Sequence, residues 1–577
     1  MPRSFGHGLI FNLIPQGTAA DVGRRPTTNR SFPHLSLQHG CRNVAIMRYK
    51  LSLLAVVTAS LLAACGGNSD SSGDSGSGSS SSGSGSTSSQ VPGTLLSPPV
   101  LLSTTSVADM LAQLTTDASS QTYGTQILAQ VLALAGAPAC NVQVFHIEYY
   151  TVGGANESTT ASGALMVPSG ADASCQGPRP IVLYAHGTST ERNFNIADLT
   201  NQENAEGILL AVFFAARGYI VVAPNYAGYD TSTLPYHPFL VGDQQSKDMI
   251  DALTAARSAL PTGSQVSDDG RLFITGYSQG GYVAMATHRA MQAADMKVTA
   301  SAPMSGPYAL AAFVDAEFEG EVSGGAPVVA TLLITAYQHS YGNIYADATD
   351  VFAPQYAPGI ATLLPSAMSR SQIYAAGLLP QTALFDSTPP TAAYADITPA
   401  TTPANLAPVF AQGFGADGLI TNAYRLSYLE DAQTHPDGGF PTLTNDLPAA
   451  APVLPWRQAL KLNDLRSWTP VAPTLLCGGD QDPEVYFSNT QLMQAYWAKY
   501  APPTTPVSVL DLDATTRSAG VDGSLQAGFQ VAKDAVAAAA VLQGATDGGE
   551  TAVFEAYHAT LVAPFCLAAV VNFFNGQ

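Results

Sequence analysis

The sequence predicts an α/β fold in which a mostly parallel sheet is flanked by helices and carries a large helical cap. From residue 142 onward, short apolar runs alternate with longer amphipathic segments, a pattern typical of buried strands joined by helices. One glycine-rich turn joins such a strand to such a helix. About 165 residues separate two of the strands, which is too long for a structureless connection in a compact domain.

The strands fall into two groups. Segments 142–150 and 161–168 lead the series and are expected to form an antiparallel pair. Six later apolar runs are expected to be strands buried on both faces: 180–186, 219–226, 271–278, 298–305, 473–479 and 507–512. Apolar residues at helical spacing predict the covering helices: 205–218, 243–260, 280–294, 489–500 and 559–574. In the last helix, Pro564 marks a kink or a late start.

The expected core is therefore split in sequence. Its first part is 93–306, of which 93–138 is expected to be largely helical, and its second part is 470–577. The cap between them covers 307–469. A second long connection contains the helical stretch 524–542, which we expect to pack against that cap.

The N-terminal region predicts export. Residues 47–64 have a basic start and an apolar run too short to span a bilayer, as in a secretory signal peptide. The end of this segment before Cys65 resembles a bacterial lipobox, which implies lipid attachment to Cys65; the alternative is an ordinary signal peptide. Because Met47 opens a complete signal by itself, we expect residues 1–46 to lie upstream of the true start or to be disordered. The Gly/Ser-rich segment 65–92 predicts a flexible tether, and Gly66 after the cysteine favours, by resemblance, the outer membrane or cell surface.

Charge and composition exclude several partners. The chain is 46% hydrophobic and has a formal net charge of −20, so we expect no nucleic acid partner. It has no Cys-x-x-Cys pair for a metal, and the chemistry considered below requires no cofactor. The expected partners are a small-molecule or lipid ester and a membrane, reached through the anchor.

Four cysteines remain in the expected folded part. An oxidising compartment makes disulfides plausible. Among the three possible pairings we favour Cys140 with Cys175 and Cys477 with Cys566, and the alternative is four buried thiols.

The glycine-rich turn is Gly276-Tyr277-Ser278-Gln279-Gly280, the one Gly-x-Ser-x-Gly in the chain. A strand precedes it and a helix follows, which is the context in which such a serine is a strained, exposed nucleophile. The alternative is a tight glycine turn without chemistry. The N–H of Gln279 and the helix dipole would face any oxyanion formed there.

A serine needs a base within hydrogen-bond reach, and histidine is the expected one. Four histidines follow Ser278. His288 lies along the next helix and points elsewhere, while His339 and His435 lie in the cap. His558 comes after the last strand, in an expected loop directly before the final helix, so we predict that it is the base.

The imidazole needs a carboxylate to fix its tautomer. Asp480 and Asp482 both follow the strand 473–479. This stretch resembles the acid-bearing loop of the α/β-hydrolase family, and matching Gly479, Pro483 and Val485 to the family pattern selects Asp482. Asp480 would then be a solvated loop residue, with the alternative register left open. The order Ser, Asp, His is that of the family.

The oxyanion hole needs a second donor. The pair His186-Gly187 resembles the His-Gly pair of lipases and esterases, which implies the N–H of Thr188 beside that of Gln279. His186 is expected to hold the loop. The α/β-hydrolase resemblance covers about 140–310 and 470–575 and is greatest to secretory lipases, with prolyl-oligopeptidase-type hydrolases next. Asn225 stands where the family often has Asp.

These observations predict a carboxylic-ester hydrolase of the serine esterase or lipase type. The alternatives are a serine peptidase of the prolyl-oligopeptidase kind and a surface binding protein on the same scaffold. The apolar, tyrosine-containing cap favours an acyl or aromatic ester.

Overall fold

The computed structural model describes residues 90–577 except 119–123, 201–204, 261–264, 438–446 and 503–505. These residues belong to one compact unit, Ser86–Gln577. The expected signal peptide, the lipidation site at Cys65 and nearly all of the expected tether lie outside the described residues.

A nine-stranded sheet forms the centre of this unit, with the strand order β1-β2-β3-β5-β4-β6-β7-β10-β11. Its strands are β1 (Val100–Thr105), β2 (Asn141–Val152), β3 (Ser158–Ser169), β4 (Gly177–Ala185), β5 (Ile220–Pro224), β6 (Val266–Tyr277), β7 (Ala300–Met304), β10 (Thr474–Gly478) and β11 (Val507–Asp511). The strands β1, β2, β3 and β5 pair antiparallel, and all pairs from β5 to β11 are parallel. The expected leading hairpin and the parallel series are therefore present.

The first strand departs from the expectation that 93–138 is largely helical. Two helices are there, but Val100–Thr105 adds to the sheet edge by pairing with β2, which is about 40 residues further along the chain. The pairing is long-range, and Val100, Leu101 and Leu102 stay about half exposed. Local spacing therefore carried little signal of a buried strand.

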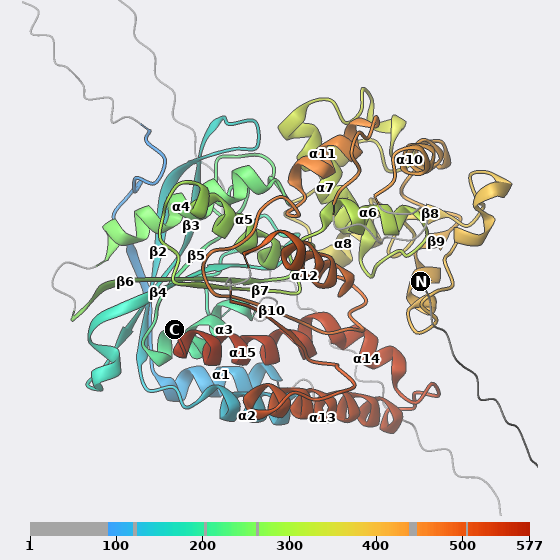
Figure 1. Cartoon of the computed structure of the whole chain (residues 1–577). Helices are drawn as coiled ribbons and strands as arrows, with labels where there is room; N and C mark the ends of the chain where they lie inside the picture. The colour runs from blue at the N-terminus through green and yellow to red at the C-terminus, as the bar shows by residue number, and fades with distance from the viewer. Residues whose placement is uncertain (1–89, 119–123, 201–204, 261–264, 438–446, 503–505) are drawn as a thin grey trace, which may run out of the picture. The chain divides into compact units, whose positions relative to one another are not determined.

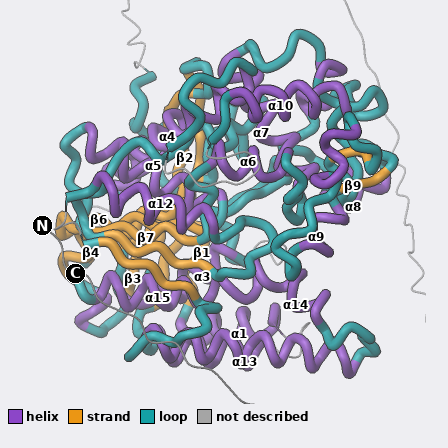
Figure 2. Tube along the Cα trace, turned by 45° about the vertical axis from the view of Figure 1, so that its right-hand side comes forward, coloured by secondary structure: helices purple, strands orange, loops and turns teal. Residues whose placement is uncertain are grey.

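Helices cover both faces of the sheet (Figures 1 and 2). One face carries α4 (Gly242–Ala259) and α5 (Gln279–Ala293), and the other carries α3 (Glu206–Phe213) and α15 (Ala563–Asn575). Outside α15 lie α1 (Val107–Ala118), α2 (Gly124–Ala135) and α13 (Gly520–Leu542), and the remaining core helices are α12 (Ser488–Tyr500) and α14 (Glu550–Ala556).

The helix α13 does not pack against the cap as expected. It lies against α2, α14 and α15 on the outer face of the helical layer. The apolar side of α13 is buried and includes Leu525, Phe529, Ala532 and Val536. Because this side packs against the core helices, no apolar side of α13 is left to pack against the cap.

The long segment between β7 and β10 forms a mainly helical body beside the sheet (Figure 1). It contains α6 (Leu310–Phe318), α7 (Ala326–Tyr341), α8 (Arg370–Ala375), α9 (Ala407–Gln412), α10 (Asn422–Thr434) and α11 (Pro455–Asn463), with the short strands β8 (Phe385–Asp386) and β9 (Phe414–Gly415). Inside it, buried Arg457 pairs with Asp315 and Asp431, and buried Arg466 pairs with Asp437 and Asp464.

Both favoured disulfides are present. Cys140 bonds to Cys175, and Cys477 at the end of β10 bonds to Cys566 in α15. The second bond joins the strand before the acid loop to the helix that follows His558. Of the described helices, the run Glu550–Asn575 is long and apolar enough to cross a membrane, but 67% of its apolar window is buried in the fold, as in a core helix.

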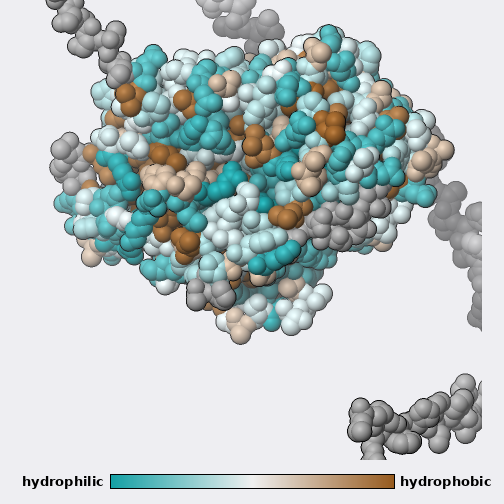
Figure 3. Space-filling model, turned by 45° about the horizontal axis from the view of Figure 1, so that its top comes forward, coloured by the Kyte–Doolittle hydropathy of each residue, from teal (hydrophilic) through white to brown (hydrophobic). Residues whose placement is uncertain are grey.

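One face of the molecule shows how exposed apolar side chains are distributed there. On the face shown in Figure 3, apolar atoms form small separate groups among polar ones. Small exposed apolar groups of this kind are normal on a folded protein.

Candidate active site

Ser278 lies on the turn between β6 and α5. Its φ is 58° and its ψ is −122°, a conformation that costs a non-glycine residue about 1–3 kcal/mol. The flanking glycines make the turn possible, since a Cβ on Gly276 would lie 2.3 Å from the oxygen of Gly280, and one on Gly280 would lie 1.9 Å from the oxygen of Ala185. The N–H of Ser278 donates to Met304 O (3.0 Å), which fixes the turn to β7.

His558 lies in a π-helical turn, Tyr557–Val562, between α14 and α15. The sequence had predicted a loop here. The turn widens the helix directly before Pro564, whose missing N–H cannot continue a regular hydrogen-bond ladder, and turns of this type are frequent at functional sites.

The structure brings His558 against Asp482. The Nδ1 of His558 donates to Oδ2 of Asp482 (2.7 Å), and both side chains are buried. The other oxygen of Asp482 accepts the N–H groups of Glu484 (3.0 Å) and Val485 (3.1 Å). Asp480 is exposed and does not contact the imidazole; its N–H donates to Asp511. Between the two registers considered, the geometry therefore selects Asp482.

Ser278 and His558 line one cavity, but no hydrogen bond joins them in this structure. The Nε2 of His558 is buried and has no partner among the described residues. With Nδ1 occupied by Asp482, this nitrogen is the one available to accept a proton. Catalytic hydrogen bonds are often long without substrate and tighten when it binds.

Burial alone disfavours the charged imidazolium and would lower the pKa of His558. Attraction to Asp482 and Glu484, together with the hydrogen bond to Asp482, outweighs burial and raises that pKa above its ordinary value. The site therefore stabilises the protonated form that a general base reaches during the reaction.

Two tyrosines hold the pair from outside, and sequence reasoning missed both. The hydroxyl of Tyr277 donates to the backbone oxygen of His558. The hydroxyl of Tyr557 donates to Asp513 (2.8 Å) and accepts the N–H of Gln481 (3.2 Å), so it ties the π-helical turn to the acid loop. Each stands beside a predicted residue in the sequence, but adjacency gives no information about a hydroxyl's partner.

The loop after β4 contains Thr188, whose N–H was predicted as the second oxyanion donor, and this residue lines the same cavity as Ser278. Glu206, at the start of α3, accepts the N–H of Gly187 (3.1 Å to each oxygen) and the hydroxyl of Tyr184 (2.6 Å). This leaves the next N–H, that of Thr188, without a hydrogen-bond partner in the described structure. Burial raises the pKa of Glu206 to about 7 despite these bonds. Sequence reasoning missed Glu206 because it lies 19 residues away in a helix.

His186 has the expected structural role. Its ring stacks on Tyr226 with centroids 4.1 Å apart, and its nitrogens lie 2.6 Å from Gly187 O and 3.0 Å from Asn225 O. Burial lowers its pKa to about 4, so the neutral ring donates to one of these oxygens. Asn225, the departure from the family pattern, is buried and accepts the N–H of Ile196 (2.8 Å) through its side chain.

The side chain of Gln279 is turned to His237. Its Nε2 donates to Nε2 of His237 (2.7 Å), whose Nδ1 donates to Ala227 O (3.0 Å). Burial lowers the pKa of His237 to about 3, which keeps the ring neutral and able to accept. The backbone N–H of Gln279, at the first position of α5, remains available to an oxyanion.

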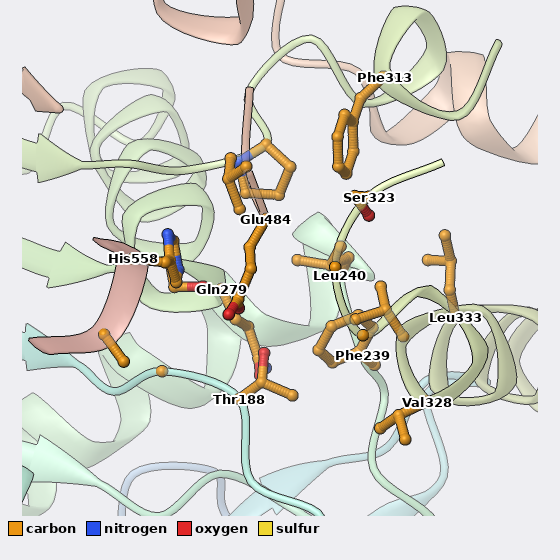
Figure 4. Close-up of a pocket in the computed structure, with 18 of the residues that line it drawn as sticks. Thr188, Phe239, Leu240, Gln279, Phe313, Ser323, Val328, Leu333, Glu484 and His558 are labelled. Atoms are coloured by element: carbon orange, nitrogen blue, oxygen red, sulfur yellow. The ribbon is translucent and has the colours of Figure 1, made fainter. Parts of the chain in front are cut away.

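The cavity has a volume of about 420 Å³, and core and cap both contribute to it (Figure 4). Phe313, Val328 and Leu333 form an apolar wall from the cap, and Phe239 and Leu240 continue it from the core. Its size and lining are those of a small-molecule site. Among the described residues, no group of three or more His, Cys, Asp or Glu side chains is arranged to hold a metal ion.

The fold and this geometry can be compared with known proteins. A sequence model of the prolyl oligopeptidase family matches residues 209–314, which include β5, β6, the serine turn and β7. The solved structure of the rice cell wall degrading esterase LipA from Xanthomonas oryzae is similar, with 25% identity and a TM-score of 0.55, covering 81% of this chain and 97% of that one. The chain has the α/β-hydrolase fold.

Other comparisons agree with this hydrolase fold. A putative hydrolase from Legionella pneumophila shares it at 19% identity and a TM-score of 0.54, covering 83% of this chain and 97% of that one. A search of curated proteins found no match.

Proposed function

We propose that this α/β-hydrolase cleaves carboxylic esters through an acyl-enzyme intermediate. The observation that carries the proposal is the buried pair of His558 and Asp482, whose free Nε2 lies in the same cavity as Ser278 on its strained turn. The LipA structure, from a rice cell wall degrading esterase, supports ester chemistry as the class.

In the proposed reaction, His558 Nε2 takes the proton of Ser278 while the serine oxygen attacks the ester carbonyl. Asp482 stabilises the imidazolium through Nδ1. The N–H groups of Gln279 and Thr188 bind the tetrahedral oxyanion, and each such donor contributes about 2.7–4 kcal/mol.

The proton then passes from His558 to the leaving alcohol, and the C–O bond to that alcohol breaks. Water repeats the attack on the acyl-enzyme: His558 takes one of its protons, the acid is released, and the proton returns to the oxygen of Ser278. The sequence of steps requires no redox or metal chemistry.

Labelling with a fluorophosphonate probe tests the serine. The wild type should label, and Ser278→Ala should remove both labelling and hydrolysis of 4-nitrophenyl butyrate. His558→Ala should lower both by at least about 10³-fold, since the triad acts as a unit. A wild type that neither labels nor hydrolyses esters would instead indicate a binding protein on this scaffold.

The match to the prolyl oligopeptidase family favours one second candidate, a serine peptidase. The same residues can attack an amide. Comparing 4-nitrophenyl esters with peptide 4-nitroanilides of the same acyl group separates the two. We expect ester turnover with little anilide turnover, and the reverse would favour the peptidase.

We further propose that the enzyme is exported and anchored by lipid at Cys65. Support comes from the lipobox-like sequence before Cys65, the Gly/Ser-rich segment after it, and the two disulfides, which suit an oxidising compartment.

A further inference from the structure

Glu484 brings a carboxylate into the catalytic cavity. It lies two residues beyond Asp482, and its side chain extends into the space lined by His558, Gln279 and Thr188 (Figure 4). Within the described part of the chain, its carboxylate makes no hydrogen bond or ion pair.

The other acidic residues of the cavity differ in this respect. Glu206 accepts bonds from Tyr184 and Gly187, as described above. Glu317 accepts a hydrogen bond from the hydroxyl of Ser323. Arg370 lines the cavity and attracts Glu484, but from beyond ion-pair distance. Among the described acidic residues that line the cavity, Glu484 is therefore the one whose carboxylate has no hydrogen bond or ion pair to a protein group.

The stem of Glu484 is held in place. Its N–H donates to Asp482, and Pro483 O accepts the N–H of Gly324 (3.0 Å) from the cap. A Cβ on Gly324 would lie 3.3 Å from Cγ of Glu484, so cap and acid loop pack closely here. The carboxylate is thus presented to the cavity by a fixed loop.

This position favours a charged partner once a substrate fills the cavity. Glu484 is exposed, so water solvates its carboxylate in the free enzyme, although nearby protein atoms raise its pKa by desolvation. When a substrate displaces that water, a cation compensates the carboxylate better than a neutral hydroxyl does.

We propose that Glu484 binds a cationic group on the ester substrate, such as a substituted ammonium. The inference rests on the proposed ester hydrolysis and adds the substrate class. Apolar walls from Phe239, Phe313 and Leu333 suit the alkyl substituents of such a cation. The formal net charge of −20 also raises the local concentration of cationic substrates.

Matched ester pairs test this directly. Butyrylcholine and 3,3-dimethylbutyl butyrate have the same shape and differ by one charge on the alcohol side. The 4-nitrophenyl esters of 4-(trimethylammonio)butanoate and 5,5-dimethylhexanoate do the same on the acyl side. A third pair, 2-hydroxyethyl butyrate and propyl butyrate, tests a neutral donor.

In at least one charged pair, the wild type should prefer the cation in kcat/KM by about tenfold or more, as expected for Coulomb attraction between two opposite charges in contact near a protein surface. Glu484→Gln should reduce that ratio to about one. Asp480→Asn, which removes one charge from the same loop outside the cavity, should keep the wild-type ratio. Fluorophosphonate labelling of each variant reports whether it is folded.

A wild-type ratio near one in both charged pairs overturns the inference, whatever the variants do. So does a ratio that Glu484→Gln leaves unchanged, or a dependence on Glu484 seen with the hydroxyl pair alone. Hydrolysis of the neutral esters distinguishes failure of the proposed function from failure of this inference. If the wild type does not hydrolyse them, the proposed ester hydrolysis is wrong. If it does, the charged pairs test the role of Glu484 alone.

Discussion

Replacing Asp482 by Asn tests whether this carboxylate is the acid that orients His558. The variant keeps the size of the side chain but removes the charge that faces Nδ1 of His558 at 2.7 Å. An amide can present its N–H₂ to that nitrogen, which would place the imidazole proton on Nε2, the wrong nitrogen for a base. The loss of a buried triad carboxylate in this way lowers kcat by about 10⁴-fold, or about 5.4 kcal/mol.

The pH dependence carries independent information. The wild-type pKa of His558 is raised above its ordinary value, and the base must be deprotonated, so kcat/KM should rise with pH through that raised pKa. Without the carboxylate the pKa falls, and the acidic limb should move to lower pH while the plateau drops. The assay is 4-nitrophenyl butyrate hydrolysis between about pH 5 and pH 10. This range includes the ordinary pKa of histidine and the raised pKa of His558.

Asp480→Asn is the matched control. Asp480 is exposed and does not contact His558, so its loss should change kcat/KM by less than about twofold, as for a screened surface charge. A loss below about tenfold in Asp482→Asn, or a larger loss in Asp480→Asn, would refute the assignment of the acid.

Three further predictions concern support, stability and location. Tyr557→Phe removes the hydroxyl between Gln481 and Asp513, so kcat should fall about fivefold at unchanged KM, with a shifted pH profile that a purely structural role would not give. Burial raises the pKa of Glu317 from 4.5 to about 7, so its contribution to folding is favourable below pH 4.5 and is lost as pH rises through 7. Glu317→Gln should therefore raise Tm at pH 8.5, by an amount equivalent to about 1–2 kcal/mol, and leave it unchanged at pH 4; equal shifts at both pH values would contradict this. Cys65→Ser should abolish palmitate incorporation and release the enzyme from the membrane fraction, and incorporation that persists would exclude this anchor.

The central parallel strands could be predicted because they are buried on both faces. Runs such as the one in β5 are continuous apolar segments, and the covering helices have clear apolar stripes. The serine turn was recognisable because its geometry leaves no room for a side chain at Gly276 or Gly280, two residues before and after Ser278. Both positions are therefore glycine in the sequence. These features are local, so a short window of sequence contains them.

Features that depend on distant pairing could not be predicted in the same way. The edge strand β1 is defined by its partner β2, and α13 by the core helices it meets. The π-helical turn at His558 depends on Pro564 and on contacts with Asp482, which is 76 residues earlier in the chain. Sequence alone gave no contact partner for Glu206, Tyr557 or Glu484.

Glu484 affects the charge balance of this site without a hydrogen bond to His558. A triad needs one carboxylate at Nδ1, and Asp482 provides it. A second carboxylate, that of Glu484, lines the same cavity and raises the pKa of His558 further. In the proposed mechanism with a neutral substrate, this charge opposes the oxyanion that would form at the N–H groups of Gln279 and Thr188. With a cationic substrate, the ion pair neutralises Glu484 before the oxyanion forms, so binding energy from a remote group lowers the barrier at the reacting one.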